Sequence, residues 1–186
     1  TCALPIYKII NYTVTEISFD RQMGYLSYHG YNPISIDEYI DCLYKGKPWP
    51  PKSVLITFDD GYRGVRRIAY PILKKYGFPA TVFASCNFLG SEELFPYDKH
   101  LEGECGDLHQ DLTPLSWDET REMLDIVSIG SHTMSHVLLA PLSDEDIRYE
   151  IGESKRVLEK ELGIKVVSFS YPGGLRQHRA FDSRTK

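Results

Sequence analysis

The chain has 186 residues, of which 42% are hydrophobic and 25% are charged, a composition typical of a globular protein with one sizeable core. Its formal net charge of -5 gives counterion release little to act on, so nucleic acid is not expected as a partner. The sequence contains no run of about 20 apolar residues that could span a membrane.

The first six residues, Thr-Cys-Ala-Leu-Pro-Ile, match the translation of a common sequencing-library adapter. We interpret residues 1–6 as non-native and residues 7–186 as one partial domain. The alternative is a genuine short N-terminal segment. No basic start followed by an apolar core is present, so the sequence predicts no secretory signal within this chain.

Two helices are predicted before the first clear strand. Phe19, Met23 and Leu26 recur at helical spacing before Gly30, which predicts the first helix. The sequence Ser-Ile-Asp-Glu at 35–38 has the pattern of a capping box and predicts the start of a second, shorter helix.

A short apolar run predicts a strand at 53–58, which leads directly into the Asp-Asp-Gly sequence at 59–61. Apolar residues on one face predict a helix at 65–76, with Pro71 as a possible kink. A buried strand is predicted at 80–84.

The stretch 86–114 has mixed charge, several glycines and no sustained period, so a long loop that covers a site is predicted. A capping box at 116–119 predicts a helix that leads to a strand at 126–129. The longest helix is predicted at 143–162, followed by a strand at 166–169.

Strands that alternate with helices imply parallel strands joined by helical crossovers, in either an open doubly wound sheet or a barrel. Periodicity does not distinguish these two architectures. In both, active sites form beyond the carboxyl ends of the strands, and this is where the sequence places residues 59–61, His132 and Tyr171.

Two pairs of side chains indicate metal-assisted hydrolysis. Asp59 and Asp60 are adjacent, so one can bind a metal while the other accepts a proton. On a helical turn, His132 and His136 would share one face and could bind the same ion. Alone, the first pair could be a simple turn and the second a surface pair. A phosphatase of the haloacid dehalogenase type would need its aspartates two positions apart, which disfavours that alternative.

The sequence resembles the polysaccharide deacetylases, also called the NodB homology domain or carbohydrate esterase family 4. Thr-Phe-Asp-Asp-Gly at 57–61 and Ser-His-Thr-Met-Ser-His at 131–136 are similar to the first two signature motifs of this family, and segments 70–81 and 150–163 also look typical. The resemblance implies a distorted (β/α) barrel, incomplete at both ends, with residues 7–186 as a partial catalytic domain.

The resemblance also implies roles for the paired side chains. Asp60, His132 and His136 would bind a divalent metal, most often zinc, although cobalt or nickel would also suit this ligand set. Asp59 would be the general base that activates water for attack on an acetyl group.

The segment Ser-Phe-Ser-Tyr-Pro-Gly-Gly at 168–174 corresponds to the third motif of the family. The resemblance implies that Tyr171, Pro172 and Gly173 line the substrate groove, with the Gly173 N–H stabilising the oxyanion. Many members have an arginine where this chain has Ser170, and that arginine orients the base. How Asp59 is held is therefore an open point. Without the other motifs, Tyr-Pro-Gly-Gly would be interpreted as a turn.

The implied function is removal of N-acetyl groups from an N-acetylglucosamine-containing polymer of the cell envelope or an exopolysaccharide, outside the cytoplasm. An O-acetyl esterase acting on xylan and an inactive carbohydrate-binding fragment are the alternatives. The general acid of the family, in a Leu-x-His segment, is expected beyond Lys186, and the oligomeric state stays open. The remaining histidines are interpreted as surface or loop residues: His29, His100, His109 and His178.

Overall fold

The structure is a computed structural model that describes residues 14–174 and 180–185. The segment predicted to be non-native, residues 1–6, and His178 lie outside the described residues. Within the described part of the chain, every helix is too short or too polar to cross a bilayer.

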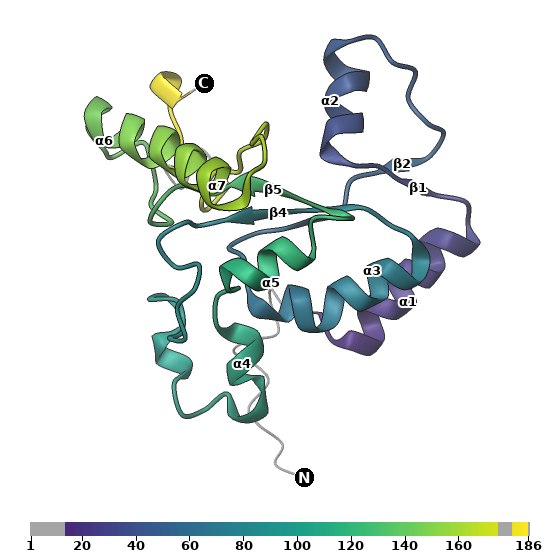
Figure 1. Cartoon of the computed structure of the whole chain (residues 1–186), viewed down its shortest axis with the longest axis horizontal. Coiled ribbons are helices and arrows are strands. Elements are labelled where there is room, and N and C mark those ends of the chain that lie inside the picture. Colours follow the sequence, from purple (N-terminus) through teal and green to yellow (C-terminus); the bar gives the residue numbers. More distant parts are fainter. Residues whose placement is uncertain (1–13, 175–179, 186) are drawn as a thin grey trace.

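The N-terminal part contains two helices and a small parallel pair of strands. Helix α1 (Glu16–Tyr28) is followed by β1 (Asn32–Pro33), α2 (Ile36–Tyr44) and β2 (Ser53–Val54), and β1 pairs with β2 in parallel. The excursion formed by β1, α2 and β2 projects away from the other strands (Figure 1). The two helices confirm the prediction, and Ser35 caps α2 as its capping pattern predicts.

A three-stranded parallel sheet forms the centre of the molecule. Its strands are β3 (Thr57–Phe58), β4 (Ala80–Ala84) and β5 (Val127–Ser131). The predicted strand at 53–58 is divided, because its first half pairs with β1 and its second half with β4. The predicted strand at 166–169 is reduced to one parallel bridge between Phe169 and Ser131.

The order of the strands decides between the two predicted architectures. The sheet has the order β3, β4, β5, and the bridge from Phe169 to Ser131 continues it in the same direction. A doubly wound sheet reverses its strand order so that helices cover both faces. Because crossovers are right-handed, strands added in one direction place their helices on one face, as in a barrel. The described part is therefore an incomplete (β/α) barrel, as predicted.

Two of the crossover helices contain a π-helical turn, which the sequence does not predict. The first crossover runs from a π-turn at Val65–Ala69 into α3 (Tyr70–Tyr76), and Pro71 lies just after the change. Proline has no N–H to donate to the preceding turn, which accounts for an irregular helix here. The predicted helix at 143–162 is likewise divided into α6 (Asp144–Arg148), a π-turn at Tyr149–Glu153 and α7 (Ser154–Leu162).

The crossover helices pack against the strands in one hydrophobic cluster. Leu73 of α3, Val82 of β4 and Leu158 of α7 are fully buried in it, together with Met123 just after α5 (Trp117–Glu122). Helix α1 lies beside α3 (Figure 1), and α5 contacts α7. This packing fixes the strands whose carboxyl ends carry the predicted site residues.

The predicted long loop at 86–114 contains short helices and a small core of its own. It includes the 3-10 turns Lys99–Leu101 and Gly106–Leu108, and then α4 (His109–Leu112). A hydrophobic cluster separate from the main core lies within this stretch and is formed by Leu94, Leu101 and Cys105. A compact excursion with its own buried side chains can hold residues in fixed positions beside a site.

Gly130 of β5 lies where the neighbouring side chains leave no room for a methyl group. An added Cβ would be 2.5 Å from Phe83 Cδ1 and 2.6 Å from Ser168 Oγ. We expect Gly130→Ala to lower the free energy of unfolding by about 1–3 kcal/mol, measured by urea denaturation. Gly152→Ala is the matched control, because apart from its chain neighbours and the backbone of its own helix nothing lies within 4 Å of its added Cβ. Equal stability of the two variants would contradict the packing described here.

Candidate metal centre

The Asp-Asp-Gly sequence forms a tight turn directly after β3. Asp60 has a φ of 70° and Gly61 a φ of 90°, so both residues are in the left-handed region. The Asp60 carbonyl accepts a hydrogen bond of 3.2 Å from the Ser85 N–H, which follows β4. A Cβ added to Gly61 would lie 3.3 Å from the Ala84 Cβ. Contact with the neighbouring strand end therefore sets the direction of the Asp60 side chain.

His132 and His136 lie in a turn after β5, and the predicted helical turn is wrong. Thr133 and His136 have φ values of 68° and 54°, which no right-handed helix contains. The two histidine rings still face each other, with their centroids 5.0 Å apart. The spacing of the histidines is thus satisfied by a different backbone conformation from the one the sequence suggests.

Long-range hydrogen bonds hold this turn in place of helical ones. The Met134 carbonyl accepts from the Asn87 N–H at 2.9 Å, and the Met134 N–H donates to the Glu150 carbonyl at 3.1 Å. The Glu150 carboxylate, only 7% exposed, accepts from the Ser135 N–H at 3.0 Å. Segments after β4 and before α7 therefore satisfy the backbone of the turn.

Asp60, His132 and His136 converge on one point. Asp60 Oδ1 lies 3.3 Å from His132 Nε2 and 3.1 Å from His136 Nε2. All three candidate ligand atoms lie within 4.8 Å of one another. Ligand atoms around a tetrahedral zinc ion, at about 2.0–2.2 Å from it, are separated by about 3.3 Å, so these residues fit a divalent ion.

The hydrogen bond of His132 leaves its other ring nitrogen available as a ligand. The side chain is 2% exposed, and Nδ1 lies 2.9 Å from the Ser170 carbonyl. A carbonyl only accepts, so Nδ1 carries the proton of this hydrogen bond, and Nε2 is the ring nitrogen directed toward Asp60. A divalent ion placed between this nitrogen and the Asp60 carboxylate could bind both.

The charge of Asp60 is stabilised by the same two histidines. Burial alone would raise the pKa of this carboxyl, because it disfavours the ionised form. Hydrogen bonds and charge attraction from His132 and His136 outweigh burial and hold the pKa of Asp60 below its ordinary value. The Asp60 carboxyl is therefore ionised across the physiological pH range, the form in which a carboxylate binds a metal.

A comparison with protein families agrees with this centre. The family model described as polysaccharide deacetylase matches residues 46–186, which include both turns. The chain belongs to the polysaccharide deacetylase family.

Individual members of the family support the assignment. YxkH of Bacillus subtilis is 32% identical over 162 residues, which cover 87% of this chain and 51% of YxkH. The poly-beta-1,6-N-acetyl-D-glucosamine N-deacetylase of Staphylococcus aureus is 30% identical over 168 residues, covering 90% of this chain and 56% of the relative. The chain thus spans about half the length of these relatives.

Two solved structures have the same fold. The Streptococcus pyogenes deacetylase PplD, in complex with acetate, has a TM-score of 0.78 and 26% identity, with 100% of this chain and 73% of PplD covered. IcaB from Ammonifex degensii has a TM-score of 0.77 and 26% identity, with 94% and 71% covered. The barrel architecture inferred from strand order therefore agrees with that of solved deacetylases.

Beside the candidate metal ligands of this deacetylase domain, Asp59 has a free carboxylate. The residue is exposed, and its side chain makes no hydrogen bond or ion pair with any other described residue. Ser170 lies at the position where many family members have an arginine. Its carbonyl accepts a hydrogen bond from His132 Nδ1. Asp59 thus directly precedes the candidate ligand Asp60 in the chain, and its side chain has no partner among the described residues.

The segment 168–174, which resembles the third motif of the deacetylases, includes the bridge at Phe169. The Tyr171 ring packs against Phe169 and Phe181, with centroids 5.0 and 4.8 Å away, and its hydroxyl donates to the Thr185 carbonyl. Pro172 is buried, which fixes the turn. Gly173 is exposed with a φ of 76°, and its N–H has no acceptor within the described part of the chain.

Three residues beside the site were missed by the sequence analysis. Tyr97 lies against His136 with ring centroids 4.6 Å apart, and the Tyr62 hydroxyl donates to Asp98 Oδ2 at 2.5 Å. Burial raises the pKa of all three side chains. For Tyr97, the signal available in the sequence was the aromatic content of the long loop at 86–114, which also contains Phe88.

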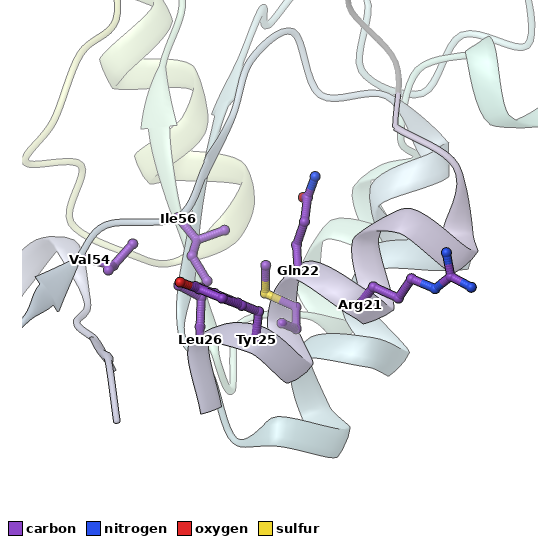
Figure 2. A pocket seen from close by; sticks show the side chains of 7 residues that line it. Arg21, Gln22, Tyr25, Leu26, Val54 and Ile56 are labelled. Atoms are coloured by element: carbon purple, nitrogen blue, oxygen red, sulfur yellow. The ribbon is translucent and has the colours of Figure 1, made fainter. Parts of the chain in front are cut away.

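A separate hollow of about 530 Å³ lies between α1 and the segment from β2 to β3 (Figure 2). No carboxylate, histidine or cysteine is among its described lining residues, which are Arg21, Gln22, Met23, Tyr25, Leu26, Val54 and Ile56. Asp60, His132 and His136 do not line it, so it is separate from the candidate metal centre of this deacetylase domain.

Proposed function

We propose that the protein is a metal-dependent hydrolase that removes N-acetyl groups from a polysaccharide containing N-acetylglucosamine. The observation that carries this proposal is the convergence of Asp60, His132 and His136, with the unpaired Asp59 directly before Asp60 in the chain. The name of the Staphylococcus aureus relative supports the choice of an N-acetylglucosamine polymer.

Asp60, His132 and His136 would hold the ion, and we propose zinc because it accepts a set of two imidazoles and one carboxylate. Cobalt or nickel would suit the same ligands. A bound divalent ion supplies Lewis acidity toward an acetyl carbonyl and makes a nearby water more acidic. The dry, hydrogen-bonded environment of His132 keeps that ligand in one orientation.

Asp59 is proposed as the general base. Its carboxylate is free to accept the proton of the attacking water as the oxygen adds to the carbonyl carbon. The carbon–nitrogen bond then breaks, and acetate and a free amine are released. Because Asp59 has no partner among the described residues, it is available to take up and return this proton.

The third motif is proposed to contact the substrate. The Gly173 N–H, which has no acceptor among the described residues, would donate to the oxygen that becomes negative as water adds. Tyr171 would present its ring edge to the sugar, since its hydroxyl is already bonded to Thr185. Pro172 is buried, so we propose that it shapes the turn.

Acetate release from two polymers tests this proposal. We expect the purified, zinc-loaded protein to release acetate and generate free amines from β-1,6-linked N-acetylglucosamine oligomers, and a chelator to abolish both. Acetate release from acetylated xylan alone would instead support an O-acetyl esterase. Release from neither polymer, with metal bound, would contradict hydrolysis and support an inactive carbohydrate-binding fragment.

A further inference from the structure

The two histidines of the candidate metal centre are held in different ways. His132 is buried, and its Nδ1 donates to the Ser170 carbonyl. His136 is 23% exposed, and its Nδ1 has no hydrogen-bond partner among the described residues. Histidine ligands of metals almost always have such an outer partner, which fixes the orientation of the ring. His136 therefore needs another source of restraint.

Tyr97 supplies the ring contact that faces His136. The two ring centroids are 4.6 Å apart, and the planes are inclined at 41°. A ring packed against an imidazole in this way restricts rotation of the imidazole, which keeps Nε2 directed at Asp60. Tyr97 is 37% exposed, so its position depends on the residues beneath it.

The long loop provides a rigid base for Tyr97. The ring of Tyr97 stacks on Phe95, with centroids 5.3 Å apart and planes inclined at 15°, and Phe95 is fully buried. Phe88 and Tyr62 pack edge-on against Phe95, at 5.3 and 4.6 Å. An aromatic cluster of this kind places Tyr97 with little freedom.

Two contacts connect this cluster to the turn that carries Asp60. Tyr62, two positions after Asp60, donates its hydroxyl to Asp98, the neighbour of Tyr97. Arg63 forms a bidentate pair with Glu92, at 2.8 and 2.9 Å, at the start of the same excursion. The turn that carries Asp60 is thus connected to the long loop that holds Tyr97 against His136.

We propose that Tyr97 is a positioning residue for His136 and replaces, by ring packing, the outer hydrogen bond that His132 has. This role rests on the proposed metal centre but is not needed for the centre to exist. It assigns a function to the long loop, which holds an aromatic side chain against a ligand. The contribution comes from the ring of Tyr97 and not from its hydroxyl.

Metal affinity and the visible spectrum of the cobalt-substituted protein test the proposal. We expect Tyr97→Leu to weaken Co²⁺ binding about 10–100-fold and to change the d–d absorption bands, which report ligand geometry. Tyr97→Phe keeps the ring and should bind like the unchanged protein. Tyr62→Phe, which removes the hydrogen bond to Asp98 and keeps the ring of the cluster, should give a smaller change in the same direction.

Tyr25→Leu is the matched control, because Tyr25 packs on His29 with nearly the same geometry, 4.1 Å and 42°, outside the site. It should leave Co²⁺ affinity and spectrum unchanged. The proposal is overturned if Tyr97→Leu keeps its Co²⁺ affinity and its absorption spectrum unchanged. If Tyr97→Leu does not fold, the same result with the milder Tyr62→Phe overturns it. It is also overturned if Tyr97→Phe loses as much Co²⁺ affinity as Tyr97→Leu. Failure of the unchanged protein to bind Co²⁺ would instead overturn the metal centre itself.

Discussion

His132→Ala is expected to purify without bound metal and to bind zinc more than about 100-fold more weakly than the unchanged protein. Removal of an outer partner of a metal ligand already costs about 10–100-fold, and here a ligand itself is lost. His132 Nε2 lies 3.3 Å from Asp60 Oδ1, and neither Asp60 nor His136 can replace it. Elemental analysis and competition with a chromophoric chelator measure the effect, and acetate release should be lost with the metal.

A second variant separates loss of metal from loss of fold. His132 is buried, so its removal can also affect packing, whereas Asp60→Asn keeps the size of the side chain. Asparagine also tolerates the φ of 70° at this position. Asp60→Asn should likewise fail to bind zinc while its circular dichroism stays unchanged. His29→Ala, at an exposed histidine, should bind zinc normally. Normal zinc content in both ligand variants would refute the candidate metal centre.

Asp59→Asn is expected to keep its zinc and to lose turnover by about 10²–10⁴-fold, the usual contribution of a general base. Asparagine has the shape of the aspartate but cannot accept a proton. The Asp59 side chain has no partner within the described part of the chain, so the substitution disturbs no observed contact. The rate constant kcat for acetate release and the zinc content, measured on the same preparation, check both parts of this prediction.

The exposed Asp107 provides a control of the same type, since Asp107→Asn should change neither zinc content nor kcat. Unchanged kcat in Asp59→Asn would remove Asp59 from the reaction but would leave the metal centre intact. A fall in its zinc content would mean that Asp59 acts as a ligand. The two outcomes therefore correct different parts of the proposal.

Local sequence signals were reliable where local physics decides the structure. Ser35 and Ser116 cap α2 and α5 as their patterns predict, because a hydroxyl beside free N–H groups needs no distant partner. Gly77 and Gly163 end their helices in the left-handed conformation for the same local reason. The predicted strand at 166–169 failed because strand formation depends on a neighbour, and only Phe169 has one among the described residues.

The candidate site shows the same division. The types of its candidate ligands and their place after strand ends were readable from the sequence, since Asp60 is the second residue after β3 and His132 directly follows β5. The turn of His136 was not, because hydrogen bonds from Asn87 and Glu150 hold it in a non-helical form. Tyr97 was missed because its loop has no period that relates it to a histidine far along the chain.

The sequence by itself determined the alternation of helices and strands, the capped helix starts and the chemical groups that make a metal centre plausible. Only the tertiary structure decided that the strands follow one another as in a barrel and that Asp60, His132 and His136 meet at one point. The physical reason is range. Caps and periodicity act within a few residues, whereas strand order and side-chain convergence depend on hydrogen bonds and packing between segments far apart in the chain.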